Sequence, residues 1–143
     1  MKWIDVAMNE IGQLEGTGTQ DNQRILEYFK AVVAIPMPHD EIPWCAVFVG
    51  WVLRQCGISP TCSAYARSYL KWGETLPEFR PGCIVVLKRG SKPYQGPVGF
   101  ALKKSIGFID ILGGNQANEV KISRFWFPKV LGFRWHPEFS NLM

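Results

Sequence analysis

The sequence predicts an α+β domain in which N-terminal helices are followed by an antiparallel sheet of about five strands. Before Pro81-Gly82, apolar residues recur at the three- and four-residue intervals of helices. After this pair, residues 83–87 form a short β-branched apolar run, which is typical of a strand buried on both faces. Because the helical patterns all precede the strand patterns, the two kinds of element are segregated along the chain, as in the α+β class.

Helical spacing occurs in several segments of the first half. They are residues 2–13, a stretch that starts after Asp21 and ends before Pro36, residues 44–56, and a short helix that Ser63 caps and Gly73 ends. The segment 44–56 has apolar side chains on nearly every face, and Pro43 suits its first position because a missing N–H is harmless there. We therefore expect this helix to be the buried centre of the domain.

Further strands are expected in the second half of the chain. They are residues 98–102, 108–112, 119–122 and 130–135, and the turns between strands are marked by Gly90, residues 104–107, Gly113-Gly114 and Pro128. The length of the chain is common for one domain, and no linker-like composition interrupts it. Residues 1–143 are therefore expected to form a single domain, and we expect it to be a monomer.

The charge distribution argues against a nucleic-acid partner. The 16 basic and 12 acidic residues give a formal net charge of +4. No run of five or more like charges occurs, which is typical of a solvated surface. The longest uncharged stretch, residues 56–66, is too short and too polar to cross a bilayer, so no membrane span is expected.

The 4 cysteines and 2 histidines do not form a metal-binding pattern. No Cys-x-x-Cys pair occurs, and we expect no metal and no other cofactor. Cys45 and Cys56 share a predicted helix that separates them by roughly 16 Å, which is too far for a disulfide. Residues 1–5 lack the pattern of a secretory signal, so synthesis in the cytoplasm with reduced thiols is expected.

Cys45 is the candidate nucleophile. It lies in the first turn of the predicted central helix, where unpaired backbone N–H groups and the positive end of the helix dipole stabilise a thiolate. The alternative interpretation is that Cys45 is a small buried hydrophobic residue. Asp40 and Glu41, just before the helix, suit its N-terminal dipole better than they suit a calcium site.

The stretch around Cys45 forms part of a longer set of motifs. The others are residues 7–16, Gly96-Pro97-Val98-Gly99-Phe100 and Leu112-Gly113-Gly114-Asn115-Gln116. Together they resemble the CHAP and NlpC-type cysteine peptidases and amidases, and more narrowly a phage and bacterial lysin subfamily. The resemblance runs from about Trp3 to Arg134. It implies a papain-like fold.

The resemblance also implies roles for individual residues. In such enzymes the cysteine attacks an amide carbonyl of peptidoglycan, a histidine on a following strand takes its proton, and a polar residue on the next strand orients that histidine. Cys45 matches the nucleophile and Asn115 the orienting residue, with Gln116 as the substitute. Trp44 and Gln116 are tentative substrate-binding residues. Without the resemblance, Gly113-Gly114-Asn115 reads as a turn that closes a hairpin.

The sequence departs from the family pattern at Pro97, where the resemblance expects a histidine. Proline cannot accept a proton, and a general acid–base group contributes roughly 10²- to 10⁴-fold to such reactions. His39, in the loop before the central helix, is the candidate substitute base, and its alternative interpretation is a solvated loop residue. His136 follows the last predicted strand, at a place with no catalytic duty in the family.

These observations favour a peptidoglycan hydrolase of the endolysin-like cysteine peptidase or amidase type, which cleaves an amide bond in the peptide moiety. It would act at the cell wall if released or delivered there. The alternative is a catalytically impaired descendant of the same fold that binds wall fragments or a protein partner. Pro97 separates the two hypotheses.

Overall fold

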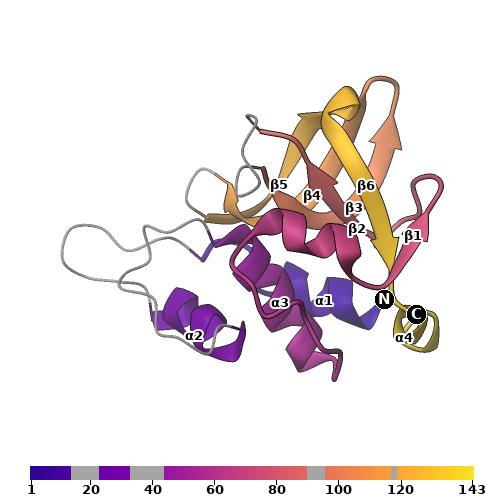
Figure 1. Cartoon of the computed structure of the whole chain (residues 1–143). Helices are drawn as coiled ribbons and strands as arrows, with labels where there is room; N and C mark the ends of the chain where they lie inside the picture. The colour runs from indigo at the N-terminus through magenta and orange to yellow at the C-terminus, as the bar shows by residue number, and fades with distance from the viewer. Residues whose placement is uncertain (14–22, 33–43, 90–95, 117–118) are drawn as a thin grey trace.

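Helices precede a curled antiparallel sheet in the computed structural model of this chain (Figure 1). The structure describes residues 1–13, 23–32, 44–89, 96–116 and 119–143, apart from the side chains of residues 115 and 116. The helices are α1 (Lys2–Met8), α2 (Gln23–Val32), α3 (Cys45–Gln55) and α4 (Pro137–Asn141), with the 3₁₀ helices η1 (Ala66–Lys71) and η2 (Phe127–Lys129). The strands are β1 (Glu74–Leu76), β2 (Ile84–Leu87), β3 (Val98–Ser105), β4 (Phe108–Gln116), β5 (Glu119–Trp126) and β6 (Val130–Trp135).

The sheet has six strands in the order β1-β6-β2-β3-β4-β5, and neighbouring strands are antiparallel. The last strand of the chain therefore lies inside the sheet, between β1 and β2. Along one row of the sheet, Val98 is opposite Val86, and Val86 is opposite Gly132. The α+β class and the order of helices before strands are confirmed.

Helix α3 is the buried centre of the helical side, as its apolar faces predicted. Residues 44–50 are all buried. The helix packs on β3 and β4, and the approach to β4 is close because Gly114 has no side chain. A Cβ at Gly114 would lie 2.6 Å from the ring of Trp44 and 2.9 Å from the Cβ of Phe48. Any larger residue at this position would push α3 away from the sheet.

The face of the sheet that points away from α3 is also buried over several strands. Val85 pairs with Gly99 on β3, and Ala101 pairs with Ile111 on β4, so these residues share one face by alternation. Val85, Ala101 and Ile111 are each at most 2% exposed. The sheet curls, as Figure 1 shows, and these buried side chains form a second apolar interior on this face. The prediction that the β2 segment is buried on both faces is confirmed.

The two ends of the described chain meet beside β2. The indole Nε1 of Trp3 donates to the carbonyl of Gly82 at 2.8 Å, and its ring stacks on Phe139 with centroids 4.2 Å apart. The backbone N–H of Lys2 donates to the carbonyl of Leu142 at 3.0 Å. Figure 1 shows the N and C labels side by side at this corner. Helices α1 and α4 thus close one end of the core together.

Several element boundaries differ from the predictions. The first helix ends at Met8 rather than near residue 13, and turns follow it up to Gly12, whose φ is +100°. Glu10, predicted on the polar face, is only 6% exposed because its carboxylate accepts from the hydroxyl of Tyr28 at 2.7 Å and pairs with Arg24 at 3.0 Å. This polar cluster ties the end of α1 to α2.

β3, β4 and β5 are longer than predicted, β6 has the predicted bounds, and the number of elements is larger. Gly113-Gly114 continues β4 instead of forming a turn. The missing side chain of Gly114 lets Trp44 and Phe48 at the start of α3 pack directly on the backbone of the strand. β1 and α4 were not predicted, since elements of 3 and 5 residues carry too little periodicity. Ser63 does not cap η1; its hydroxyl accepts from the N–H of Tyr65, two residues on, which forms a turn before the helix. Among the described residues, no helix is long and apolar enough to cross a membrane.

Candidate functional site

Cys45 is the first residue of α3 and lies against the start of β3. Its side chain is 7% exposed, and Trp44 before it is completely buried. Backbone N–H groups of Val98 and Ala46 are within hydrogen-bonding range of the sulfur. One donor comes from the strand and the other from the first turn of the helix. The predicted position of Cys45 at a helix N-terminus, next to unpaired N–H groups, is confirmed.

The effect of this position on the thiol is opposite to the sequence prediction. Burial raises the pKa of Cys45, and this outweighs the N–H groups of Val98 and Ala46 and the positive charge of Arg89, which all lower the pKa. The thiol is therefore the favoured form in this structure. The sequence showed the donors, but the extent of burial depends on tertiary packing.

Pro97 precedes the strand residue that contacts the candidate nucleophile. The N–H of the next residue, Val98, reaches the sulfur of Cys45, and the carbonyl of Pro97 accepts from the N–H of Leu87 at 3.0 Å. Gly96 before it has a φ of +122°, and a Cβ there would clash with the carbonyl oxygen of Leu87. The tight start of β3 thus fixes the backbone of position 97 one residue from the contact with Cys45, and a proline ring offers no proton acceptor.

The backbone of Asn115 also lies near α3. Asn115 follows Gly114 on β4, and Gly114 packs on Trp44 and Phe48. The side chains of Asn115 and Gln116 lie outside the described part of the chain, so their predicted roles stay predictions. Trp44 is 0% exposed and its ring lies 6.1 Å from that of Tyr28, a packing position, so substrate contact by Trp44 also stays a prediction.

His136 is the one histidine among the described residues, and it does not lie at the sulfur of Cys45. His39 and the acidic pair Asp40 and Glu41 lie outside the described residues. His136 is the N-cap of α4, where its Nδ1 accepts from the N–H of Glu138 at 3.0 Å and its ring packs beside Trp72. It is four residues along β6 from Gly132, the residue in the row of Val98, and so roughly 13 Å away along the strand.

Tyr69 on η1 carries a buried hydroxyl that the sequence did not single out. The side chain is 0% exposed, and its oxygen makes no hydrogen bond within the described part of the chain. Thr61 is close to it, but the Thr61 hydroxyl shares a hydrogen bond of 2.7 Å with Ser68. Burial raises the pKa of Tyr69, so this phenol stays protonated.

A small cavity of about 60 Å³ opens beside Pro97. The described residues that line it are Leu87, Lys88, Arg89, Pro97, Phe125 and Lys129. Half of them are cationic and none is acidic. Lys88 and Arg89 are neighbours in the sequence, but only the pairing of β2 with β3 and β6 brings them together with Pro97 and Lys129.

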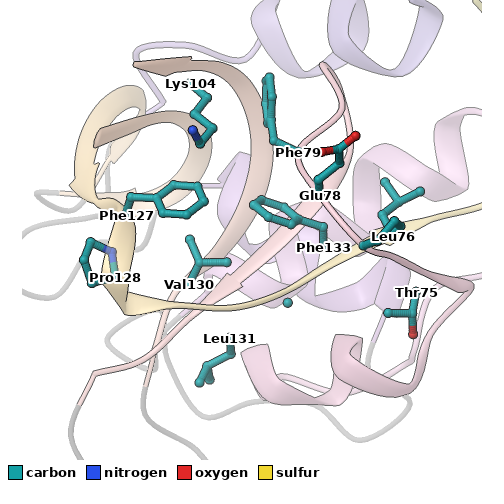
Figure 2. Close-up of a pocket in the computed structure, with 12 residues that line it drawn as sticks. Thr75, Leu76, Glu78, Phe79, Lys104, Phe127, Pro128, Val130, Leu131 and Phe133 are labelled. Carbon is teal, nitrogen blue, oxygen red and sulfur yellow. The ribbon is translucent and has the colours of Figure 1, made fainter. Parts of the chain in front are cut away.

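A much larger groove, of about 760 Å³, lies elsewhere on the curled sheet. Figure 2 shows Phe79, Phe127 and Phe133 gathered around it, with Lys104 and Glu78 at its rim. The ring of Phe133 is 6.3 Å from that of Phe79 and 6.2 Å from that of Phe127, between centroids. No cysteine or histidine is among its described lining residues.

Comparison with known proteins adds no assignment: neither a scan against models of protein families nor a search of curated proteins finds a match. Within the described ranges, no group of three or more His, Cys, Asp or Glu side chains is placed to hold a metal ion. The cysteines at 45, 56, 62 and 83 are all free thiols. Cys45 is the one among them that lies at a helix N-terminus with a strand N–H on its sulfur.

Proposed function

We propose that this protein is a papain-like cysteine peptidase or amidase that hydrolyses an amide bond in the peptide part of peptidoglycan. The observation that carries the proposal is the contact between Cys45 and the start of β3. A cysteine on the first turn of a buried helix, with the N–H of Val98 on its sulfur, is arranged as the nucleophile of the enzymes that the sequence resembles. The packing of Gly114 on the same helix supports Asn115 as the third member of the site.

The reaction would proceed by acyl transfer. The sulfur of Cys45 attacks the amide carbonyl carbon, the thiol proton goes to water, and the C–N bond breaks as the amine leaves with a proton from water. Hydrolysis of the thioester by a second water then restores the thiol and releases the acid. The positive end of the α3 dipole, at which Cys45 lies, would favour the negative charge that develops on the carbonyl oxygen.

The absence of an imidazole at position 97 makes this reaction slow. Water is a poor substitute for a general base, and the raised pKa of Cys45 leaves little thiolate at neutral pH. These two observations favour the second candidate function, in which the fold binds wall fragments or a protein partner without cutting them. The two functions differ in one measurable product, the new amine that hydrolysis releases.

The test compares the unmodified chain with Cys45→Ala on purified peptidoglycan. The expected result is loss of turbidity and release of new amino groups with the unmodified chain, and only background release with Cys45→Ala. Cys62→Ala is the matched control, because Cys62 is an exposed free thiol, and this variant keeps the activity. Mass spectrometry of the fragments identifies the bond that is cut.

Equal amine release by Cys45→Ala and the unmodified chain would contradict the proposed mechanism. If neither variant releases amines but both co-sediment with peptidoglycan, the binding function is supported instead. Co-sedimentation is measured on the same samples, so one experiment separates the two candidates.

A further inference from the structure

An exposed apolar surface lies at the end of the sheet where β3 turns into β4. Ile106, in the turn, is 98% exposed. Two aromatic side chains lie where the strands end: Phe108 is 39% exposed, and Trp126, opposite it on β5, is 51% exposed. Exposed apolar side chains that gather at one place indicate an interaction surface, which scattered ones do not. We call Ile106, Phe108 and Trp126 the apolar tip.

The strands behind the apolar tip hold it in place. The rings of Phe108 and Trp126 meet edge to face, with centroids 5.4 Å apart. The N–H of Phe127 donates to the carbonyl of Gly107 at 2.9 Å, which ties the turn to the end of β5. Gly107 has a φ of +78°, which a glycine adopts without strain in so short a turn. Binding through the tip therefore costs little conformational entropy.

A charged row crosses the same face of the sheet behind the apolar tip. Lys103 on β3 is opposite Asp110 on β4, and Asp110 is opposite Arg124 on β5. Asp110 and Arg124 form an ion pair at 3.0 Å, whereas Lys103 forms none with a described residue. Because Phe108 and Asp110 are two positions apart on one strand, the row lies roughly 7 Å behind the aromatic rings. Its two cations and one acid leave an excess of positive charge.

This combination fits the surface of an anionic lipid bilayer. Peripheral segments bury their apolar side chains about 5–10 Å deep, at the boundary between headgroups and acyl chains. A tip inserted to this depth brings a row roughly 7 Å behind it to the level of the lipid phosphates. Tryptophan is enriched at this boundary because its ring is largely apolar while its N–H is polar.

A protein partner fits the same surface less well. A stable protein–protein interface buries about 800 Å² on each side. A whole aromatic side chain buries roughly 150–250 Å², so the partly exposed rings of Phe108 and Trp126, together with Ile106, offer only about half of the required area. The row next to them is charged, and charged residues are depleted at the cores of protein interfaces.

We propose that the apolar tip docks this protein on an anionic lipid bilayer, with Lys103 and Arg124 against the lipid phosphates. Only the tip enters the bilayer, so the contact needs no membrane-spanning helix. The docking surface is separate from the candidate nucleophile. Val98, which contacts the sulfur of Cys45, lies at the opposite end of β3 from the turn, roughly 23 Å away. The inference therefore stands whether or not the protein hydrolyses an amide.

The test measures co-flotation of the full chain with lipid vesicles. One set contains phosphatidylglycerol and phosphatidylcholine, and the other contains phosphatidylcholine alone, which has no net charge. The unmodified chain is expected to bind the anionic vesicles, and the neutral ones roughly tenfold more weakly. Ile106→Asp lowers binding to the anionic vesicles by about tenfold or more, through lost apolar burial and an added negative charge. Lys103→Gln lowers it by about fivefold.

Two matched controls lie away from the apolar tip. Ile11→Asp makes the same change at another exposed isoleucine. The next residue, Gly12, donates to the carbonyl of Val120, which is six residues from Trp126 along β5 and so roughly 20 Å away. Lys30→Gln removes an exposed cation of α2. Both variants keep the binding of the unmodified chain, because charges that far from the bilayer are screened by salt.

Insertion of the apolar tip is measured through the fluorescence of Trp126, the most exposed tryptophan of the chain. Lipids brominated on their acyl chains quench a tryptophan that reaches them. We expect vesicles that contain such lipids to quench the bound protein. Trp126→Phe loses this quenching but keeps most of the vesicle binding, since phenylalanine retains an apolar ring.

The proposal is overturned if the unmodified chain does not float with anionic vesicles, if Ile106→Asp and Ile11→Asp weaken binding equally, or if Trp126 of the bound protein is not quenched. It is also overturned if the unmodified chain is a dimer in sedimentation without lipid and Ile106→Asp is a monomer, because the tip would then be an interface between two copies. Amine release from peptidoglycan is unchanged in Ile106→Asp, so failure of this proposal is distinguishable from failure of the proposed function.

Discussion

Two hollows of this molecule differ in size and in chemistry. The larger, of about 760 Å³, is lined mainly by apolar side chains, and no cysteine or histidine is among its described lining residues. The smaller, of about 60 Å³, is lined by three cationic and three apolar residues. Cys45 is not among the described lining residues of either. The size of a cavity therefore does not locate the candidate nucleophile.

The difference has a physical origin in how the lining residues interact. In the large groove, the rings of Phe127 and Phe133 pack with centroids 6.2 Å apart, and Lys104 lies 4.8 Å from the ring centroid of Phe127. These contacts stabilise the groove by burial and a cation–π contact. In the small cavity, in contrast, cationic side chains gather without an acid among the described lining residues, an arrangement that adds nothing to stability.

The largest expected effect separates the small site from the rest of the molecule. Pro97→His puts an imidazole beside Cys45, and we expect amide hydrolysis to rise by roughly 10²- to 10⁴-fold, because a general base then takes the thiol proton. Amine release from peptidoglycan at neutral pH is the measurement.

Leu131→His is the control for Pro97→His, since Leu131 is an exposed residue of the large groove. The double variant Pro97→His with Cys45→Ala must lose the gain. If Leu131→His raised amine release as much, or if the gain survived removal of Cys45, the contrast between the two hollows would fail.

A second prediction tests the large groove as a structural feature. Phe133 is 6% exposed and contacts the rings of Phe79 and Phe127. We expect Phe133→Ala to lower the free energy of unfolding by about 3–5 kcal/mol, through lost burial and the cavity it leaves. Chemical denaturation measures this. An unchanged free energy of unfolding in Phe133→Ala would contradict this structural role.

The smallest predicted effect concerns the pH dependence of stability that comes from the buried thiol of Cys83. Burial raises the pKa of Cys83 from 9.0 to about 11. As pH rises, the unfolded chain loses this proton first, so the stabilising contribution is complete below pH 9 and is lost as pH rises toward 11. The expected loss is at most about 2.7 kcal/mol. Cys83→Ala should therefore show a shallower fall of unfolding free energy between these pH values.

Cys62→Ala serves as the comparison for that measurement, because Cys62 is exposed. Burial also raises the pKa of Tyr28 and Tyr69, and both tyrosines are present in every variant, so their contribution cancels in the difference. An identical pH dependence in Cys83→Ala and the unmodified chain would show that the Cys83 thiol ionises normally in the folded protein.

The sequence predicted the order of the fold well because long periodic segments carry strong signals. The helix around Trp44 and Cys45 and the run at 83–87 were both found where they were expected. β1 was missed because three residues have almost no period, and the boundary of β4 was misplaced because glycines that allow close packing look like turn residues.

The place of Cys45 at a helix start was predictable, but the energetics of its thiol were not. Cys45 could be singled out from its place at a helix start, whereas positions 97 and 115 came from the resemblance. The net direction of the Cys45 pKa could not be derived, since burial by distant segments decides it. The same reason hid the partners of Glu10 and the meeting of Arg89 with Lys129, which lie 40 positions apart in the chain.

The interior position of β6 has a consequence for how the molecule is assembled. β1 and β2 do not pair with each other; β6 lies between them and completes both edges. During synthesis, the edges of β1 and β2 that pair with β6 therefore stay unpaired until β6 emerges more than 40 residues later. Such long-range pairing is slow. The backbone link from Lys88 to Lys129 forms in that same late step. A nascent chain would thus carry the Cys45 thiol long before the cationic cavity forms, and that cavity would be completed only as folding ends.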